Sequence, residues 1–185
     1  MKNAWLGLSA LAVGFLLSRP AAATDYYVEG SVSGGGSTWG SDPNVQGALR
    51  TGFEFVDIVS VDLQGRIGYS AVDERMIEIV GLGTKLAIPI EPFIPHLRLH
   101  ALHFHEVPVS AMHEDTFMHV IGVGDGIRHR FGFEAALGAS YVFATVDRTK
   151  FLAQMEAYVD VFPDDGKGPI IYSGGGLGLG LQYDI

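Results

Sequence analysis

The stretch that decides the fold is VQGALRTGFEFVDIVSVDLQGRIGY, residues 45–69. On both sides of Val56–Ile58, apolar residues alternate with polar or small ones. Leu49 and Phe53 alternate with Arg50 and Glu54 before the break, and the same pattern resumes after it. A period of two residues indicates β-strands, and a short interruption between two such runs predicts an antiparallel hairpin.

The same pattern recurs along the chain and predicts eight strands. They are expected over Tyr26–Gly34, Val45–Phe55, Val59–Ser70, Val80–Ile88, Pro95–Phe104, Gly126–Phe143, Phe151–Val161 and Ile170–Asp184. A helix competes at Lys150–Tyr158, where good helix formers are frequent. The alternation continues through that segment and favours a strand.

The two faces of these strands differ sharply in charge. One face, which carries Leu63, Leu137 and Leu179, holds no Asp, Glu, Lys or Arg in any expected strand. The other face holds six acidic and six basic residues, which we predict to form an interior polar network: Glu29, Arg50, Glu54, Asp62, Arg66, Lys85, Arg98, Arg128, Arg130, Glu134, Glu156 and Asp160. An apolar face toward lipid and a polar face toward the lumen define a transmembrane β-barrel, and closure leaves no strand edge unpaired. We therefore predict an all-β, eight-stranded, antiparallel up-and-down transmembrane barrel.

The charges of the interior are expected to neutralise one another. An eight-stranded barrel is only wide enough for side chains to fill it. Arg50 and Asp62 lie inward on adjacent strands at similar height, which predicts a direct or diagonal ion pair between them.

The connections and the aromatic residues agree with a barrel. Long connections alternate with short ones, as expected for extracellular loops and periplasmic turns. Aromatic residues gather near the expected strand ends, where two interfacial girdles are predicted. One girdle comprises Tyr26, Phe53, Phe55, Phe93, Phe143, Phe151 and Tyr183, and the other comprises Tyr69, Phe104, Phe162 and Tyr172.

Residues 1–23 have the pattern of a cleavable signal peptide, and residues 24–185 then form the barrel domain. Lys2 precedes an apolar stretch, and Ala21–Ala23 supplies small residues for cleavage. The 185 residues include no cysteine, 48% are hydrophobic and only 18% are charged. The formal net charge of −9 argues against a nucleic-acid partner.

The order of these features resembles the small bacterial outer-membrane barrels of the porin-like and outer-membrane-protein-A-like group. Gly47–Phe55 with Val59–Tyr69, Gly81–Ile88 with Phe93–Leu99, and the terminal strand Gly174–Ile185 carry the resemblance. It implies export through the periplasm to the outer membrane of a Gram-negative bacterium. The implied partners are outer-membrane lipid, lipopolysaccharide and the barrel-insertion machinery, and a monomer is expected. Family members usually end in an aromatic residue, whereas this chain ends in Ile185.

No catalytic site, metal site or cofactor is predicted. His103 and His105 share one strand face beside Glu106, and His113, Glu114, Asp115 and His119 follow in the next loop. That group makes a transition-metal site conceivable, but a solvated loop is the simpler interpretation. Ser110 near His113 is the only local nucleophile–base pairing. The predicted function is a structural or surface-exposed barrel that engages a ligand or partner. The alternatives are a lipid A-modifying enzyme and a soluble lipocalin-like periplasmic carrier.

Overall fold

The structure is a computed structural model. It describes residues 24–37, 42–55, 57–72, 74–113, 118–119, 122–124, 126–163 and 169–185. The signal peptide expected over residues 1–23 lies outside the described residues. Among the described residues, no helix is long and apolar enough to cross a membrane.

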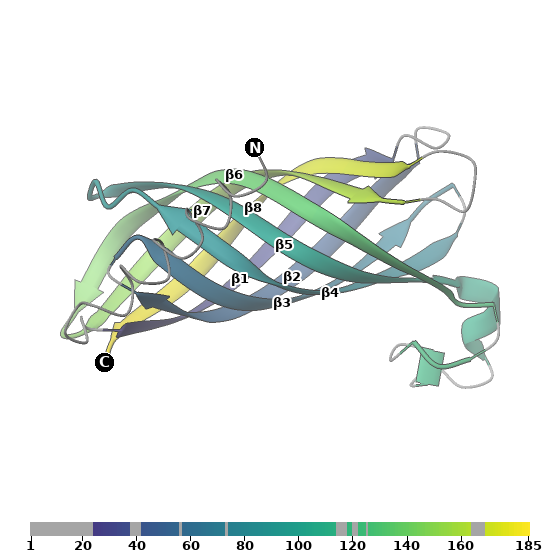
Figure 1. Cartoon of the computed structure of the whole chain (residues 1–185), viewed down its shortest axis with the longest axis horizontal. Helices are drawn as coiled ribbons and strands as arrows, with labels where there is room; N and C mark the ends of the chain where they lie inside the picture. Colours follow the sequence, from purple (N-terminus) through teal and green to yellow (C-terminus); the bar gives the residue numbers. More distant parts are fainter. Residues whose placement is uncertain are drawn as a thin grey trace, which may run out of the picture.

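Eight antiparallel strands form a closed barrel in which each strand pairs with its neighbours in sequence, and β1 pairs with β8 (Figure 1). The strands are β1 (Thr24–Ser37), β2 (Pro43–Phe55), β3 (Val59–Ser70), β4 (Arg75–Ala87), β5 (Phe93–Pro108), β6 (Arg128–Val146), β7 (Thr149–Phe162) and β8 (Ile170–Asp184). A short 3-10 helix, η1 (Val109–His113), follows β5. The predicted up-and-down barrel is confirmed, and the segment Lys150–Tyr158 is strand, as expected.

The outer surface of the barrel is apolar. Leu82, Leu137 and Leu179 are 61%, 69% and 65% exposed, although each lies in the middle of a strand. The opposite face of the same strands is buried: Gln64, Arg98 and Asp160 are at most 1% exposed. Because side chains alternate along a strand, every strand presents one face to the surroundings and one to the lumen.

The two ends of the barrel differ in their connections. The tight turns after β2, β4 and β6 lie at the same end as the C-terminus, and the connection after β5 projects from the other end (Figure 1). Asp57 and Asp147 adopt positive φ angles of 60° and 52° in two of the turns, a conformation that Asp tolerates better than most residues. In barrels of this kind, short turns are periplasmic and long loops extracellular. We call the two ends the turn end and the loop end.

Strands β4 and β5 extend further toward the loop end than predicted. Strand β4 begins at Arg75 rather than Val80, and β5 continues to Pro108 rather than Phe104. In this region the inward residues Ile77 and Ile79 are apolar and 1% exposed. The pattern of polar inward and apolar outward residues that marked the strands elsewhere is therefore lost there, since Glu78 lies between them on the outward face.

The prediction of an aromatic girdle is wrong for three residues at the loop end. Phe104, Phe162 and Tyr172 are 1%, 0% and 4% exposed and lie inside the barrel. They occupy positions on the inward face of β5, β7 and β8. The alternation of side chains along the strand therefore decides where they point, although they lie near the rim. Tyr69 is 38% exposed and lies outside. At the turn end, the exposed aromatic residues include Phe53, Phe93, Phe143 and Tyr183.

Candidate functional site

Arg98 lies at the centre of the charged interior. Its side chain is fully buried and contacts carboxylates from three strands, none of which is adjacent to β5. Its Nε donates to Glu156 at 2.9 Å and its Nη1 to Asp62 at 3.1 Å, while Nη2 donates to Glu29. The guanidinium group therefore joins opposite walls of the barrel.

His100 lies two residues after Arg98 on the same face of β5 and also joins carboxylates of different strands. Its Nδ1 lies 2.7 Å from Glu134, and its Nε2 contacts Asp62. The Tyr27 hydroxyl also donates to Asp62, at 2.6 Å. The contacts from His100 Nε2, Tyr27 and Arg98 together satisfy the Asp62 carboxylate, which is 1% exposed. His100 was expected on the inward face, but the charge pattern alone gave it no role.

The remaining buried cations also pair across the lumen. Arg50 lies 2.7 Å from Glu156, and Lys85 lies 3.2 Å from Glu54. Arg66 lies 3.1 Å from Glu134 and 2.9 Å from Asp160. We call this set the interior network: Glu29, Arg50, Glu54, Asp62, Arg66, Lys85, Arg98, His100, Glu134, Glu156 and Asp160. It draws on every strand from β1 to β7.

The expected pair between Arg50 and Asp62 is not formed. Arg50 is opposite Gln64 in the β2–β3 register, and its Nε donates to that residue at 3.1 Å. Its terminal nitrogen reaches across the lumen to Glu156 instead. The reason is the narrow bore, which places carboxylates of the far wall as close as those of the adjacent strand.

Two predicted interior cations lie at the mouth of the loop end. Arg128 is 4.0 Å from Glu106 with its side chain 56% exposed, and Arg130 is 3.6 Å from the same carboxylate. Strand β6 is paired with β7 only from Phe133 onward. Arg128 therefore lies on an extension that β5 alone supports, outside the enclosed lumen.

An apolar plug closes the lumen above the interior network. It consists of Ile77, Ile79, Leu102, Phe104, Phe162, Ile170 and Tyr172. The rings of Phe104 and Phe162 lie 4.6 Å apart, and Tyr172 lies 5.6 Å from Phe104. Within the network, a void of about 20 Å³ is bordered by Arg50, Arg66 and Glu156. That volume suits about one water molecule, so the interior is filled along much of its length.

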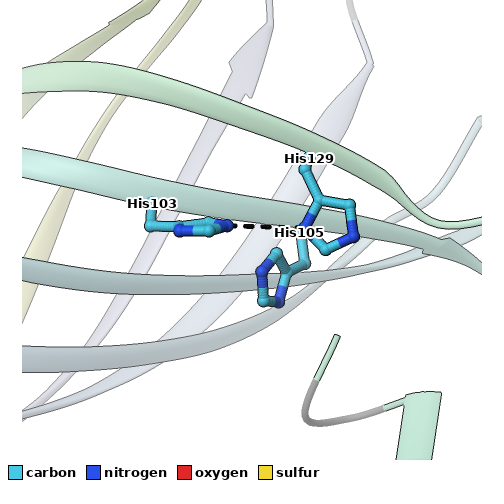
Figure 2. Close-up of side chains that lie close together, drawn as sticks. All are labelled: His103, His105 and His129. Atoms are coloured by element: carbon cyan, nitrogen blue, oxygen red, sulfur yellow. Dashed lines mark hydrogen bonds between the residues drawn. The ribbon is translucent and has the colours of Figure 1, made fainter. Parts of the chain in front are cut away.

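Three histidines gather on the outer wall near the loop end (Figure 2). His103 and His105 come from β5, and His129 comes from β6. One ring nitrogen of each lies within 4.8 Å of the other two, so the three rings are close enough to share one metal ion; we call them the histidine cluster. Glu106, which was considered with His103 and His105, lies on the inward face instead. Residues 114–117 lie outside the described residues, and His119 is buried in the loop.

Sequence reasoning missed His129 because it lies 24 residues after His105, beyond the whole loop. The strand register supplies the link, since His105 and His129 are directly opposite each other in the β5–β6 pair. A register prediction for that hairpin would have found the cluster, but the length of the loop left the register open.

A closed eight-stranded barrel with an apolar exterior and a charged, filled interior is a transmembrane β-barrel. No protein-family model and no curated protein matches the sequence. Solved structures do match it in fold. Neisserial surface protein A has a TM-score of 0.58 at 13% identity, covering 90% of this chain and 100% of that chain.

Two further solved structures have the same architecture. The attachment invasion locus protein of Yersinia pestis has a TM-score of 0.55 at 10% identity, covering 88% of this chain and 100% of its own. The outer membrane protein OprG from Pseudomonas aeruginosa has a TM-score of 0.50 at 12% identity, covering 89% and 98%. The expected resemblance to small outer-membrane barrels is thus confirmed at the level of the fold.

Proposed function

We propose that this protein is an integral outer-membrane barrel that works as a closed scaffold and acts through its extracellular end. The observation that carries the proposal is the filled lumen. The interior network crosses the bore from wall to wall, and the apolar plug seals it toward the loop end. A barrel filled in this way offers no route for solutes, so its activity belongs to its outer surface and loops.

The distribution of polarity argues against a soluble carrier. A lipocalin-like barrel holds an apolar ligand in an apolar interior and shows a polar exterior to water. Here Leu137 and Phe131 are 69% and 71% exposed, whereas Arg98 and Asp160 are fully buried. The surroundings that suit this exterior are the acyl chains of outer-membrane lipid and lipopolysaccharide.

The proposal includes export behind residues 1–23, insertion by the barrel-insertion machinery, and a role without enzymatic catalysis. We orient the barrel with its turn end in the periplasm and its loop end outside, because outer-membrane barrels have short periplasmic turns and longer extracellular loops. Fractionation tests the location: the protein should be recovered with the outer membrane, and recovery in the salt-washed soluble periplasm would rule the proposal out.

Electrical recording tests the closed lumen. Purified, untagged barrel is inserted into planar lipid bilayers, and a variant with Phe104→Ala and Phe162→Ala, which thins the apolar plug, is recorded beside it. The wild-type protein should show no stable conductance. Stable, large and ungated currents from the wild-type monomer would contradict a closed scaffold.

A further inference from the structure

The histidine cluster lies on two rigid, hydrogen-bonded strands. His105 is directly opposite His129, and His103 is opposite Phe131, one step further along the same face. Since residues two apart on a strand share a face, all three imidazoles project outward from the barrel. A site built on strands holds its ligands in position better than a site built on loops.

The distances between the rings fit a shared metal ion. His103 Nε2 lies 3.4 Å from His129 Nδ1. Two nitrogens bound at ~2.05 Å to a tetrahedral zinc ion lie about 3.3 Å apart, so these two atoms already have the required separation. The ring of His105 lies 4.5 Å from that of His103 and 4.6 Å from that of His129, centroid to centroid. One ring nitrogen of His105 lies within 4.8 Å of a ring nitrogen of each of the other two histidines.

We propose that His103, His105 and His129 form a binding site for a late first-row divalent transition-metal ion on the outer wall of the barrel. Neutral imidazole suits zinc, copper and nickel, whereas calcium and magnesium prefer oxygen ligands. Three protein ligands leave at least one coordination position for water or an external ligand, which is the pattern of exchangeable zinc sites.

A buried carboxylate next to the cluster supports the assignment. Glu78 of β4 is directly opposite His105 in the β4–β5 pair. It is 7% exposed, and neither of its carboxylate oxygens has a hydrogen-bond partner among the described residues. A buried charge without a partner is costly. A dication held by the neighbouring histidines compensates that charge, and carboxylates commonly orient metal-bound histidines as outer partners.

The site is accessible from outside although the loop partly covers it. His129 is exposed, and His103 and His105 are half-buried. The backbone of Gly122 lies over His105: a Cβ atom added to Gly122 would be 2.2 Å from the His105 ring. His105 also borders an apolar groove of about 1060 Å³ on the outer wall. A metal ion can therefore reach the cluster from the side of the exposed His129.

The test is a calorimetric titration of the refolded, untagged barrel with Zn²⁺, with Co²⁺ absorption as a second readout. We expect one ion per barrel and the visible bands of histidine-bound Co²⁺. Loss of an outer partner alone weakens metal sites 10–100-fold, so loss of a ligand in His129→Ala or His103→Gln should cost at least about 100-fold in affinity. Phe131→Leu is the matched control, because its ring packs on His103 but binds no metal.

Folding of every variant is checked by heat-modifiable migration on a detergent gel, which is independent of metal. The proposal is supported if Zn²⁺ binding is lost in a folded histidine variant and kept in Phe131→Leu. It is overturned if the wild-type barrel shows no saturable binding. Equal binding by the wild type and by His129→Ala, or by His103→Gln if His129→Ala does not fold, would overturn it as well.

Discussion

At the scale of single residues, Arg98 links more of the interior than any other cation of the interior network. Its guanidinium contacts carboxylates of β1, β3 and β7 at once. Without it, Glu29, Asp62 and Glu156 would be left with their contacts to Lys85, His100 and Arg50. A buried ion pair adds little by itself, but removing one partner leaves an uncompensated charge.

Substitution of this residue tests the network. Arg98→Ala should lower the free energy of unfolding by about 3–5 kcal/mol, because the remaining buried cations no longer balance the buried carboxylates. Urea titration of the barrel in lipid vesicles measures the change. Arg128→Ala is the control: its side chain is 56% exposed, and exposed ion pairs contribute about 0–1 kcal/mol. Equal effects of the two substitutions would show that the lumen is hydrated.

The pairing of Arg50 is tested by a double-mutant cycle. Arg50→Ala and Glu156→Ala should show a coupling of about 0.5–3 kcal/mol, as expected for residues in one ion-pair network. The coupling between Arg50→Ala and Asp62→Ala should be smaller, because Asp62 pairs with Arg98 and His100. A larger coupling to Asp62 would restore the pairing expected from the sequence.

The sequence determined the side on which each of these residues lies but not its partner. The alternation placed Arg50, Asp62 and Glu156 inward, since that depends only on a period of two. Partners across the lumen depend on the bore and the tilt of the barrel, which the alternation does not encode. For Phe104 the alternation alone predicts an inward position, which is correct. The girdle prediction, which rested on its closeness to a strand end, is wrong.

At the scale of strands, β8 differs from the others because four successive inward positions are glycine: Gly174, Gly176, Gly178 and Gly180. A Cβ atom at Gly178 would lie 2.6 Å from the carbonyl oxygen of Gly30, and one at Gly176 would lie 2.7 Å from that of Val32. These glycines let β8 approach β1 closely where the barrel closes. The register places this Gly-rich run against β1, at the seam that closes the barrel.

Barrel closure should therefore be sensitive to a single methyl group on β8. Gly178→Ala is expected to reduce the folded fraction, seen as loss of the compact, heat-modifiable form after refolding. Gly65→Ala is the matched control, since a Cβ atom at Gly65 meets nothing within 4 Å. The interpretation of the seam fails if Gly178→Ala folds as well as Gly65→Ala.

Strand ends were the weakest part of the sequence interpretation. The alternation of polar and apolar residues identified all eight strands, but it stops where the inward residues become apolar. Residues 75–79 read RMIEI, and Ile77 and Ile79 point into the plug rather than into a polar lumen. The plug could not be predicted, because its members come from four strands that meet only in the closed barrel.

At the scale of the whole molecule, the barrel presents its apolar side to lipid. The exposed leucines surround the barrel, and the charges are enclosed. A soluble protein would show its charged side chains to water. Here the charged side chains of the lumen pair with one another from opposite walls. In the proposed function the loop end, with the histidine cluster at its edge, faces the cell exterior.

The most direct test measures where the outer face lies. The chain has no cysteine, so a fluorophore can be attached to one introduced cysteine at Leu137, Leu179 or Asp57 in the barrel refolded into vesicles. Leu137 and Leu179 are outward positions on β6 and β8, and Asp57 lies in a turn. Lipids with a quencher near the bilayer centre should strongly quench the labels at Leu137 and Leu179 and leave the label at Asp57 bright. Water-exposed, unquenched labels at Leu137 and Leu179 in folded protein would contradict the transmembrane barrel.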